Sequence, residues 1–371
     1  MTGARTTYFN GRIFDGEHLF DGHALSIEGG GVVALGPESD VERSGDVVDL
    51  NGDILSPGYV DLQVNGGDGV MLNDAPTVET LERIASAHRG LGVTALLPTL
   101  ITDTPEITRA AVAAAVEATR AGVPGVAGLH LEGPHLSVER KGAHDPALIR
   151  RMEDADLAAL LTAAEALPVL KVTVAPENTT EAQVRVLTDA GVLVSLGHTD
   201  ADFATCCRYF EAGARCATHL FNAMSQLGNR EPGLVGAVLA EGRASAGLIA
   251  DAVHVHPATI RAAWEAKEGP GEIFLVSDAM AVAGSDLTEF ELGGRRITRR
   301  DGVLTLGDGT LAGADLDLTT AVRVMVTEVG VSLEAALGAA TSVPASLIGL
   351  TATLDDPIRI ASDLSGLRPL H

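Results

Sequence analysis

Eight short apolar runs alternate with helical stretches along most of the chain. The runs are Tyr59–Val64, Thr94–Leu97, Val126–Leu131, Leu170–Val174, Leu193–Leu196, Ala217–Leu220, Gly247–Ala250 and Ile273–Val276. The stretches between them, such as Val78–Leu91 and Pro105–Ala121, are rich in Ala, Leu, Glu and Arg. Apolar strands that alternate with helices pair in parallel and are buried on both faces. Eight such units predict an α/β fold, a (β/α)8 TIM-like barrel.

An open, doubly wound sheet is the alternative arrangement for this pattern. Such a sheet usually carries Gly-x-Gly-x-x-Gly after its first strand, where the glycines cradle a dinucleotide. The corresponding segment here, Asn65–Gly69, does not match that pattern. The sequence therefore favours the closed barrel.

The first 56 residues have a different pattern, of short strands and turns. Thr6–Phe9 and Arg12–Phe14 flank Asn10-Gly11, which predicts a hairpin because both residues tolerate positive φ. Ala24–Ile27 and Val32–Leu35 flank Gly29-Gly30-Gly31 and predict a second hairpin. Ser56-Pro57-Gly58 then breaks the pattern, so we expect a small β domain over residues 1–56 before a barrel over residues 57–350.

Composition narrows the class of protein. The chain has 371 residues, of which 46% are hydrophobic and 20% charged, and this excludes intrinsic disorder. Twenty-six basic side chains against fifty acidic ones give a formal charge of −24, which disfavours nucleic acid as a partner. A small anionic metabolite stays compatible, because a few arginines and histidines can make one pocket locally positive.

Cysteine usage and the absence of targeting signals predict a soluble, cytoplasmic protein. Cys206, Cys207 and Cys216 are clustered rather than dispersed, which fits a reducing compartment. The segment Met1–Asn10 lacks the basic and apolar regions of a signal peptide. No apolar run approaches the roughly 20 residues that a membrane helix needs.

Polar side chains gather just after the predicted strands. Chemistry in a (β/α)8 barrel takes place at the carboxyl ends of the strands, so these residues predict a site. Singly, each has an ordinary alternative, such as a structural histidine, a loop carboxylate or a helix cap. Together they occupy the same end of seven of the eight runs: Gln63 and Asn65, Glu132 and His135, Glu177, His198, His219 and Asn222, Asp251 and His254, and Asp278.

Four of these residues match the inventory of a metal-dependent hydrolase. Two histidines and one carboxylate are the usual ligands of catalytic zinc, and a further carboxylate is needed to move the proton of the attacking water. Glu132, His198, His219 and Asp278 supply this set. Serine and cysteine nucleophiles are weaker hypotheses, because no Gly-x-Ser-x-Gly elbow is present and Cys206-Cys207 lie in a helical stretch.

At these residues the sequence resembles the N-acetylglucosamine-6-phosphate deacetylase family of the amidohydrolase superfamily. The resemblance extends from about Gly11 to Leu350. It is carried by Leu55–Gly58, Leu97–Leu100, Leu129–Pro134, Lys141–His144, Gly197–Thr199, Thr218–Met224, Arg230–Gly233, Ile249–His254, Ser277–Ala279 and Thr310–Gly313. It implies hydrolysis of N-acetyl-D-glucosamine 6-phosphate to glucosamine 6-phosphate and acetate.

The resemblance also implies a role for each site residue. Glu132, His198 and His219 would hold the catalytic metal, and Asp278 would take a proton from the attacking water and later protonate the amine. The family is dimeric and shares its phosphate site between subunits, so either Arg230 or His254 would act on the neighbouring subunit. The residues implied in substrate binding are Ala143, His144, Asn222, Ala223, Arg230, His254, Leu311, Ala312 and Gly313.

Two departures from the pattern matter. Superfamily members with two metals usually carry His-x-His after the first strand, whereas this chain has Gln63-Val64-Asn65. Amides are poor zinc ligands beside imidazole, so we predict one divalent metal, Zn²⁺ by default, with Fe²⁺, Co²⁺ or Ni²⁺ as alternatives. The C-terminal tail, residues 351–371, is short for the β-sandwich that family members complete there.

Two other functions remain open on sequence alone. The first is an amidohydrolase that acts on an N-acyl amino acid or a cyclic amide. The second is a catalytically inactive relative that binds a sugar phosphate, which the altered tail suggests. The intact set of metal, base and phosphate residues favours the active deacetylase over both.

Overall fold

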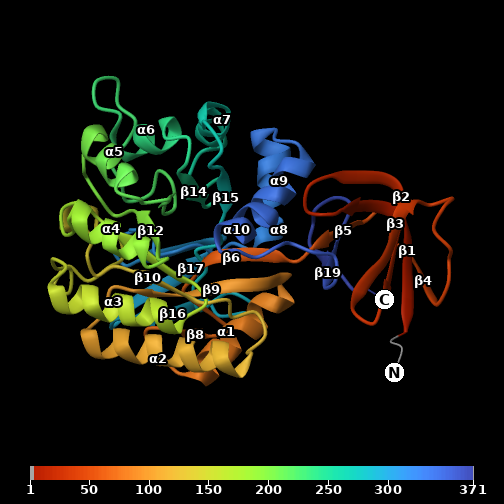
Figure 1. The fold of residues 1–371 in the computed structure, drawn as a ribbon, viewed down its shortest axis with the longest axis horizontal. Helices are drawn as coiled ribbons and strands as arrows, with labels where there is room; N and C mark the ends of the chain where they lie inside the picture. The colour runs from red at the N-terminus through yellow and green to blue at the C-terminus, as the bar shows by residue number, and fades with distance from the viewer. Residues whose placement is uncertain (1–3, 371) are drawn as a thin grey trace.

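The computed structural model describes residues 4–370, and its central element is a sheet of eight parallel strands (Figure 1). Neighbouring strands in the sheet are also neighbours among the predicted runs, from β6 to β15. The strands are β6 (Tyr59–Val64), β9 (Val93–Ile101), β10 (Leu129–Glu132), β11 (Leu170–Val174), β12 (Leu193–Leu196), β13 (Cys216–Ala217), β14 (Ser245–Leu248) and β15 (Ile273–Leu275). Each predicted run overlaps a strand, although the run at 217–220 overlaps β13 at one residue only.

The sheet closes on itself just beyond its first and last strands. A parallel bridge joins Val64 to Ala279, the Asp278 N–H donates to the Gln63 carbonyl at 3.1 Å, and the Asn65 N–H donates to the Ala279 carbonyl at 2.9 Å. Closure pairs backbone groups that an open sheet would leave exposed at its edges. The predicted TIM-like barrel is therefore confirmed, and the doubly wound alternative is wrong.

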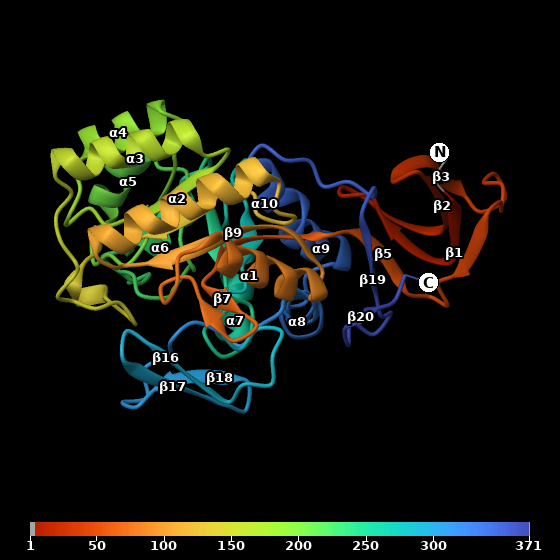
Figure 2. The ribbon, with the colours of Figure 1, turned by 90° about the horizontal axis from the view of Figure 1, so that it is seen from below.

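Helices pack around the barrel (Figures 1 and 2). Their ends follow local signals: α2 begins after Thr104, whose hydroxyl accepts from the Ile107 N–H, and ends at Gly122 with φ of 70°. Among the described residues, no helix has the length and apolar character needed to cross a membrane. The helices are α1 (Val78–Gly90), α2 (Pro105–Ala121), α3 (Asp154–Ala166), α4 (Glu181–Asp189), α5 (Phe203–Glu211), α6 (Gly233–Ala240), α7 (Pro257–Ala266), α8 (Leu318–Val324), α9 (Leu333–Ala340) and α10 (Ser342–Leu347).

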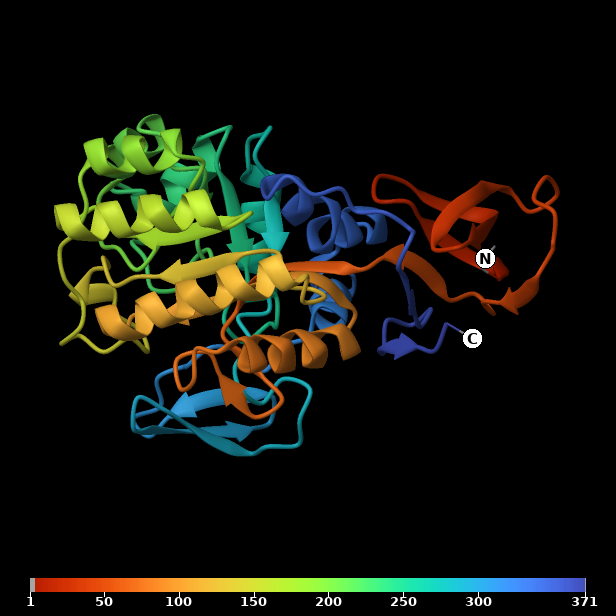
Figure 3. The same ribbon diagram turned by 60° about the horizontal axis from the view of Figure 1, so that its bottom comes forward.

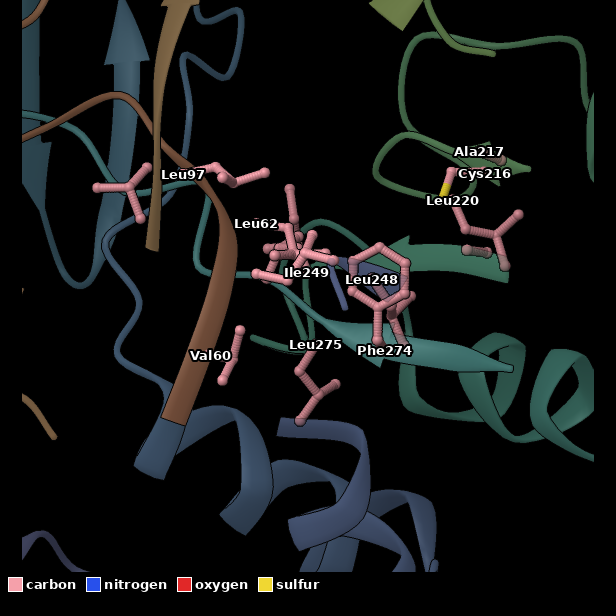
Figure 4. Packing of buried hydrophobic residues seen from close by; sticks show 14 of the residues in the cluster. Val60, Leu62, Leu97, Cys216, Ala217, Leu220, Leu248, Ile249, Phe274 and Leu275 are labelled. Atoms are coloured by element: carbon pink, nitrogen blue, oxygen red, sulfur yellow. The ribbon is translucent and has the colours of Figure 1, made fainter. Parts of the chain in front are cut away.

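The barrel strands share one continuous apolar core (Figure 4). Val60 and Leu62 from β6, Leu97 from β9, Leu248 from β14 and Phe274 from β15 all belong to it, and none is more than 4% exposed. Burial of each such side chain contributes about 1.5–3 kcal/mol relative to exposure. This packing makes the barrel a rigid support for the residues at the strand ends.

The N-terminal strands and the C-terminal segment together form a second sheet beside the barrel (Figure 3). It has a core of its own, which includes Tyr8, Ile13, Leu25 and Leu354. This arrangement confirms the predicted fold class, a barrel with a small β domain. The strands are β1 (Arg5–Phe14), β2 (Leu19–Glu28), β3 (Gly31–Pro37), β4 (Asp46–Asp49), β5 (Ile54–Pro57), β19 (Pro357–Ile360) and β20 (Leu367–Arg368).

The short C-terminal tail takes part in this second sheet. β19 pairs antiparallel with β5, and Arg359 Nε lies 2.8 Å from Asp53 Oδ2. The domain boundaries, residues 1–56 with part of 351–371 and residues 57–350, stay a prediction, and residues 1–3 and 371 lie outside the described part of the chain.

The hairpin predicted at Asn10-Gly11 is wrong. β1 runs through both residues, and its pairing with β2 shifts register at this point. Asn10 does have a positive φ of 57°, but the left-handed residue makes a β-bulge rather than a turn. Gly11 is required there because a Cβ would lie 2.5 Å from the Asp53 carbonyl and 2.6 Å from Leu50 Cβ. The expected positive φ is therefore found at Asn10 only, and it serves a bulge rather than a turn.

The second predicted hairpin is confirmed. β2 and β3 pair antiparallel around Gly29-Gly30, whose φ angles are 62° and 82°. Two consecutive left-handed residues form the tight turn that matches the twist of the flanking strands.

A small antiparallel sheet inserted after β15 was not predicted. It consists of β16 (Glu289–Leu292), β17 (Arg295–Arg300) and β18 (Val303–Leu306), which lie together at the lower edge of Figure 2. The sheet packs on an apolar cluster of its own that includes Met280 and Ala312. A two-stranded ribbon, β7 (Gly66–Gly67) with β8 (Val70–Met71), contributes Met71 to the same cluster. The insertion therefore covers one side of the barrel mouth.

The bulge at Gly11 yields a stability prediction. Gly11→Ala should lower the free energy of unfolding by about 1–3 kcal/mol, because the added methyl group overlaps Asp53 and Leu50. Urea unfolding followed by circular dichroism measures the change. Gly90→Ala is the control: a Cβ at Gly90 meets nothing within 4 Å, so stability should be kept or slightly raised. Equal stability of the Gly11 variant and the native chain would contradict the bulge packing.

Candidate active site

The carboxyl ends of the barrel strands surround a cavity of about 260 Å³. The cavity combines titratable side chains on its floor with apolar side chains on its walls, an arrangement typical of small-molecule sites. Predicted residues that line it are Asn65, Glu132, Ala143, His144, His198, His219, Asn222, Ala223, His254, Asp278, Leu311 and Gly313. Lining residues that were not predicted are Ile101, Gly142, Ile249, Met280, Leu292 and Thr310.

Three donor atoms converge on one point of the cavity floor. Glu132 Oε1 lies 3.2 Å from His198 Nε2 and 3.1 Å from His219 Nε2, and the two nitrogens are 3.0 Å apart. Side chains that bind a divalent cation at about 2.0–2.2 Å in a tetrahedral arrangement have donor atoms roughly 3.3–3.6 Å apart. The three distances are a few tenths of an ångström shorter than this, so a small outward shift of the side chains would accommodate a divalent cation, and the chemistry of the donor set fits one.

Hydrogen bonds prepare two of these side chains for a cation. His198 Nδ1 lies 2.8 Å from the Arg140 carbonyl, which can only accept, so Nδ1 carries the proton and Nε2 keeps its lone pair. Burial alone would raise the pKa of Glu132, but its contacts with His198 and His219 hold that pKa well below the ordinary value. The cluster thus presents a carboxylate and an imidazole lone pair.

The backbone is bent sharply at three residues of the site. The backbone φ angles of His198, His219 and Asp278 are 48°, 31° and 50°, values that residues other than glycine rarely adopt. Each stands within a few residues of a strand end, and the left-handed bend turns its side chain toward the cavity. Backbone strain of this kind concentrates at functional sites, where the surrounding structure enforces it.

Asp278 is a buried carboxylate that faces the same cavity. It is 8% exposed, and burial together with the Glu132 carboxylate raises its pKa above the ordinary value. A raised pKa makes a carboxylate a better proton acceptor at neutral pH. The chain passes close to it at Gly313, where φ is 65° and a Cβ would lie 2.9 Å from the Asp278 carbonyl oxygen.

Two further histidines line the cavity with their rings fixed. His144 Nδ1 lies 2.7 Å from Thr102 Oγ1, and burial holds the pKa of His144 well below its ordinary value. His254 Nδ1 lies 2.6 Å from Asp251 Oδ2, whose other oxygen accepts the Val253 and His254 backbone N–H groups. Thr102 and Asp251 therefore orient the two rings and leave each Nε2 for a ligand; neither residue was predicted in that role.

Several predicted residues lie outside the cavity lining. Arg230 is exposed on the loop before α6, and Ala312 is fully buried in the cluster beneath the inserted sheet. Gln63 lies under the floor and contacts Glu132 and Asp278. His135 and Glu177 also follow strands, but they hydrogen-bond to the Arg150 carbonyl and to Thr199, so both are structural.

Comparison with known proteins identifies the family. A model of the amidohydrolase family matches residues 54–354, which is most of the chain. The chain belongs to the amidohydrolase family. A model of the NagA composite domain also matches residues 8–55 of this amidohydrolase. The predicted resemblance to the superfamily is thus confirmed.

Relatives of this amidohydrolase include several sugar-phosphate deacetylases. It is 45% identical to N-acetylgalactosamine-6-phosphate deacetylase of Shewanella sp. (strain ANA-3), over 81% of this chain and 75% of the relative. It is 34% identical to N-acetylglucosamine-6-phosphate deacetylase of Haemophilus influenzae, over 88% and 85% of the two chains. A solved N-acetyl-D-glucosamine-6-phosphate deacetylase of Mycobacterium smegmatis, an Asp-to-Ala variant in complex with N-acetyl-D-glucosamine-6-phosphate, has a TM-score of 0.90 and 31% identity, covering 98% and 97%.

The donor cluster yields a metal-binding prediction. His198→Asn should weaken binding of a divalent metal by at least about 100-fold. Loss of a residue that only hydrogen-bonds to a metal ligand already lowers metal affinity by about 10- to 100-fold, and loss of a ligand itself should cost more. Titration of chelator-stripped protein with Zn²⁺ measures the affinity. His135→Asn, a change in a buried histidine outside the cavity, should leave it unaltered. Equal affinities of the two variants would remove His198 from the ligand set.

Proposed function

We propose that this amidohydrolase removes the acetyl group of N-acetyl-D-glucosamine 6-phosphate, giving D-glucosamine 6-phosphate and acetate in amino-sugar catabolism. The observation that carries the proposal is the meeting of the Glu132–His198–His219 cluster and Asp278 in one cavity. This set is the inventory for amide hydrolysis by an activated water. The activity of relatives from Shewanella to Haemophilus, deacetylation of an amino-sugar 6-phosphate, supports the same substrate class.

The chemistry divides between a cation and Asp278. A divalent cation held by Glu132, His198 and His219 would lower the pKa of a water molecule and polarise the amide carbonyl. Asp278 takes a proton from the attacking water and so becomes a carboxylic acid. It then returns that proton to the amide nitrogen, because an unprotonated amine is a poor leaving group. The raised pKa of Asp278 suits both steps.

Zinc is the cation we propose, one per chain. Two imidazoles and a carboxylate are ligands that zinc accepts readily. Gln63 and Asn65 occupy the positions where a second histidine pair would stand, and amides bind zinc poorly. Fe²⁺, Co²⁺ and Ni²⁺ can use the same three ligands and are outcomes of the metal analysis.

Sugar recognition falls to the polar groups around the cavity mouth. We assign His144, Asn222, His254 and the backbone at Ala143 and Ala223 to the sugar phosphate, with Leu311, Ala312 and Gly313 closing over it. Ala312 acts through the loop, since its own side chain is buried away from the cavity. A neutral His144 with a free Nε2–H is suited to donate to a sugar or phosphate oxygen.

Arg230 completes the phosphate site from a second subunit in this proposal. Arg230 is exposed and does not line the cavity of its own chain, and the same loop exposes Leu227. A homodimer that buries this loop against the neighbouring cavity would bring the guanidinium to phosphate, for which its paired donors are well suited.

The cytoplasm is the compartment that we propose for this protein. Its three cysteines are free, which fits a reducing compartment.

N-acetyl-D-galactosamine 6-phosphate is a second candidate substrate. The 45% identity to the Shewanella enzyme named for that substrate favours it. The two sugars differ only in the configuration of the hydroxyl group at C4, which is not the carbon that bears the acetamide, so one metal and base arrangement can serve both.

An assay of acetate release tests the activity and ranks the two sugars. The zinc-loaded protein should release one acetate per amine formed from N-acetylglucosamine 6-phosphate, and EDTA-treated protein should be inactive until zinc is restored. The galactose epimer and an N-acetyl amino acid are run in parallel. Faster turnover of the amino acid derivative would point to the rival amidohydrolase activity, and no turnover of any substrate by metal-replete protein would point to a binding protein.

Asp278→Asn should lower kcat by at least about 100-fold, since it removes the group that moves both protons. Metal content should stay at one per chain, because Asp278 is not in the donor cluster. Steady-state kinetics and metal analysis on the same preparation provide the comparison. Near-normal turnover in the metal-replete variant would assign the proton transfers to another group.

Arg230→Ala should lower kcat/KM for the phosphorylated sugar by about 10- to 100-fold, the usual cost of a charge-assisted hydrogen bond. Its effect on unphosphorylated N-acetylglucosamine should be small. An equal loss on both substrates would show that Arg230 does not recognise phosphate.

Mixing two variants tests whether Arg230 acts across a dimer. Dimers formed from one Arg230→Ala chain and one Asp278→Asn chain contain one site with both native residues only if Arg230 comes from the partner. Refolding the two together should therefore restore activity above that of either alone, and failure to do so despite subunit exchange would place Arg230 in its own site.

A further inference from the structure

The Asp278 carboxylate is held unevenly, and this asymmetry distinguishes its two oxygens. Oδ1 accepts from Asn65 Nδ2 at 2.7 Å and from Gln63 Nε2 at 3.0 Å. Oδ2 accepts no side-chain hydrogen bond from the described residues, and Asp278 faces the cavity. One oxygen is thus occupied by two donors, while the other is available to a ligand.

The two donors come from one strand segment, at the place where the barrel closes. Gln63 and Asn65 are two positions apart, so their side chains leave the strand on the same face. The same two residues also hold Asp278 and Ala279 through backbone hydrogen bonds. Asp278 is therefore attached to this segment by its main chain and by its carboxylate.

The orientation of both amides follows from the charge of their partners. An ionised carboxylate only accepts, so the NH₂ end of each amide must face it. Gln63 Nε2 also lies 3.3 and 3.4 Å from the two oxygens of Glu132. A neutral donor between two carboxylates reduces their repulsion without adding a charge, and it ties the proposed base to a proposed metal ligand.

This orientation carries a cost in hydrogen bonding. Gln63 Oε1 and Asn65 Oδ1 are buried, and neither has a hydrogen-bond partner among the described residues. An unsatisfied buried acceptor costs more than a typical hydrogen bond contributes, because the group has lost its water without gaining a partner. Two such acceptors at adjacent same-face positions indicate that this segment is arranged to place N–H groups on Asp278 rather than to maximise stability.

We infer that Gln63 and Asn65 are positioning residues that hold Asp278 through Oδ1 and leave Oδ2 as the oxygen that takes and returns the proton. Two donated hydrogen bonds occupy the lone pairs of Oδ1 and make that oxygen the weaker base. They also stop the carboxylate from rotating, so the same oxygen faces the reacting groups in both proton transfers. This inference rests on the proposed role of Asp278 as the base.

The first test removes the shorter of the two hydrogen bonds, from Asn65 Nδ2 to Asp278 Oδ1. Asn65→Leu keeps the size of the side chain and removes the donor, and it should lower kcat by about 10- to 100-fold, as loss of a supporting shell does. KM and zinc affinity should change little, because Asn65 does not contact the donor cluster. Asn178→Leu removes a half-buried amide donor from the Leu136 carbonyl, away from Asp278, and should keep native kcat. A native kcat in Asn65→Leu would overturn the inference.

Gln63→Met removes the contacts of Gln63 with both Glu132 and Asp278, and zinc affinity provides a readout other than activity. Gln63 touches Glu132 as well as Asp278, so this variant should lose zinc affinity in direct titration in addition to kcat. Unchanged zinc affinity together with unchanged kcat would remove Gln63 from the positioning role. A structure of zinc-loaded Asn65→Leu should show the Asp278 carboxylate rotated or in two orientations, whereas a native orientation counts against the inference.

A double-variant cycle separates positioning from a general structural effect. If Asn65 acts only through Asp278, adding Asn65→Leu to Asp278→Asn should cost nothing further, whereas independent effects multiply. A trifluoroacetyl analogue of the substrate, with its more reactive amide, keeps the residual rates measurable. If the fold-losses in kcat of the two single variants multiply in the double variant, the positioning role of Asn65 is overturned but the role of Asp278 as the base is not. Native turnover by Asp278→Asn instead overturns the proposed base itself, so the two failures are distinguishable.

Discussion

The site depends on the approach of one carboxylate and two imidazoles to about 3 Å of one another in a buried place. Such a cluster is costly to bury unless the groups share a proton or a cation. The carboxylate stands at the end of β10, and the imidazoles follow β12 and β13, so only a sheet that curves around a common axis brings them together. The closed barrel supplies that curvature, and the left-handed bends at His198 and His219 supply the last turn of each side chain.

Closure also determines where Asp278, the proposed proton-transfer group, lies. Gln63 and Asp278 are 215 residues apart in the chain, yet their contact seals the barrel. The first strand and the segment after the last strand are the neighbours in an eight-strand cylinder that lie farthest apart in the sequence. The proposed base, Asp278, therefore lies where the barrel closes, beside the amides that hold it, while the proposed metal ligands follow other strands.

Much of this organisation was predictable, because burial leaves a strong local signal. Parallel strands buried on both faces give uninterrupted apolar runs, and the polar residues after seven of the eight runs mark the mouth of the barrel. The signals at Asn10-Gly11 and at Arg230 were misleading or incomplete, for different reasons. An Asn-Gly pair with a left-handed asparagine can form a bulge as well as a turn, and the sequence around an exposed arginine does not show which subunit's site it would complete. The inserted sheet β16–β18 was missed because its strands are short and two of them, β16 and β17, are strongly charged, as in Arg295–Arg300, and so lack an apolar run. The wall residues Ile249 and Met280 were missed because apolar side chains at a cavity have the same composition as the core.

The pairing of β19 with β5 has a consequence for biosynthesis. Arg359 contacts Asp53 across a separation of 306 residues, so the small sheet pairs β5 with a strand that is synthesised only after the whole barrel. During translation β5 waits with one edge unpaired while the whole catalytic cylinder is made and folds. A nascent chain that stalls before residue 357 would carry an exposed edge on β5 that is able to pair with other chains. The pairing of β19 therefore covers an open edge of the small sheet, which lies apart from the candidate site in the barrel.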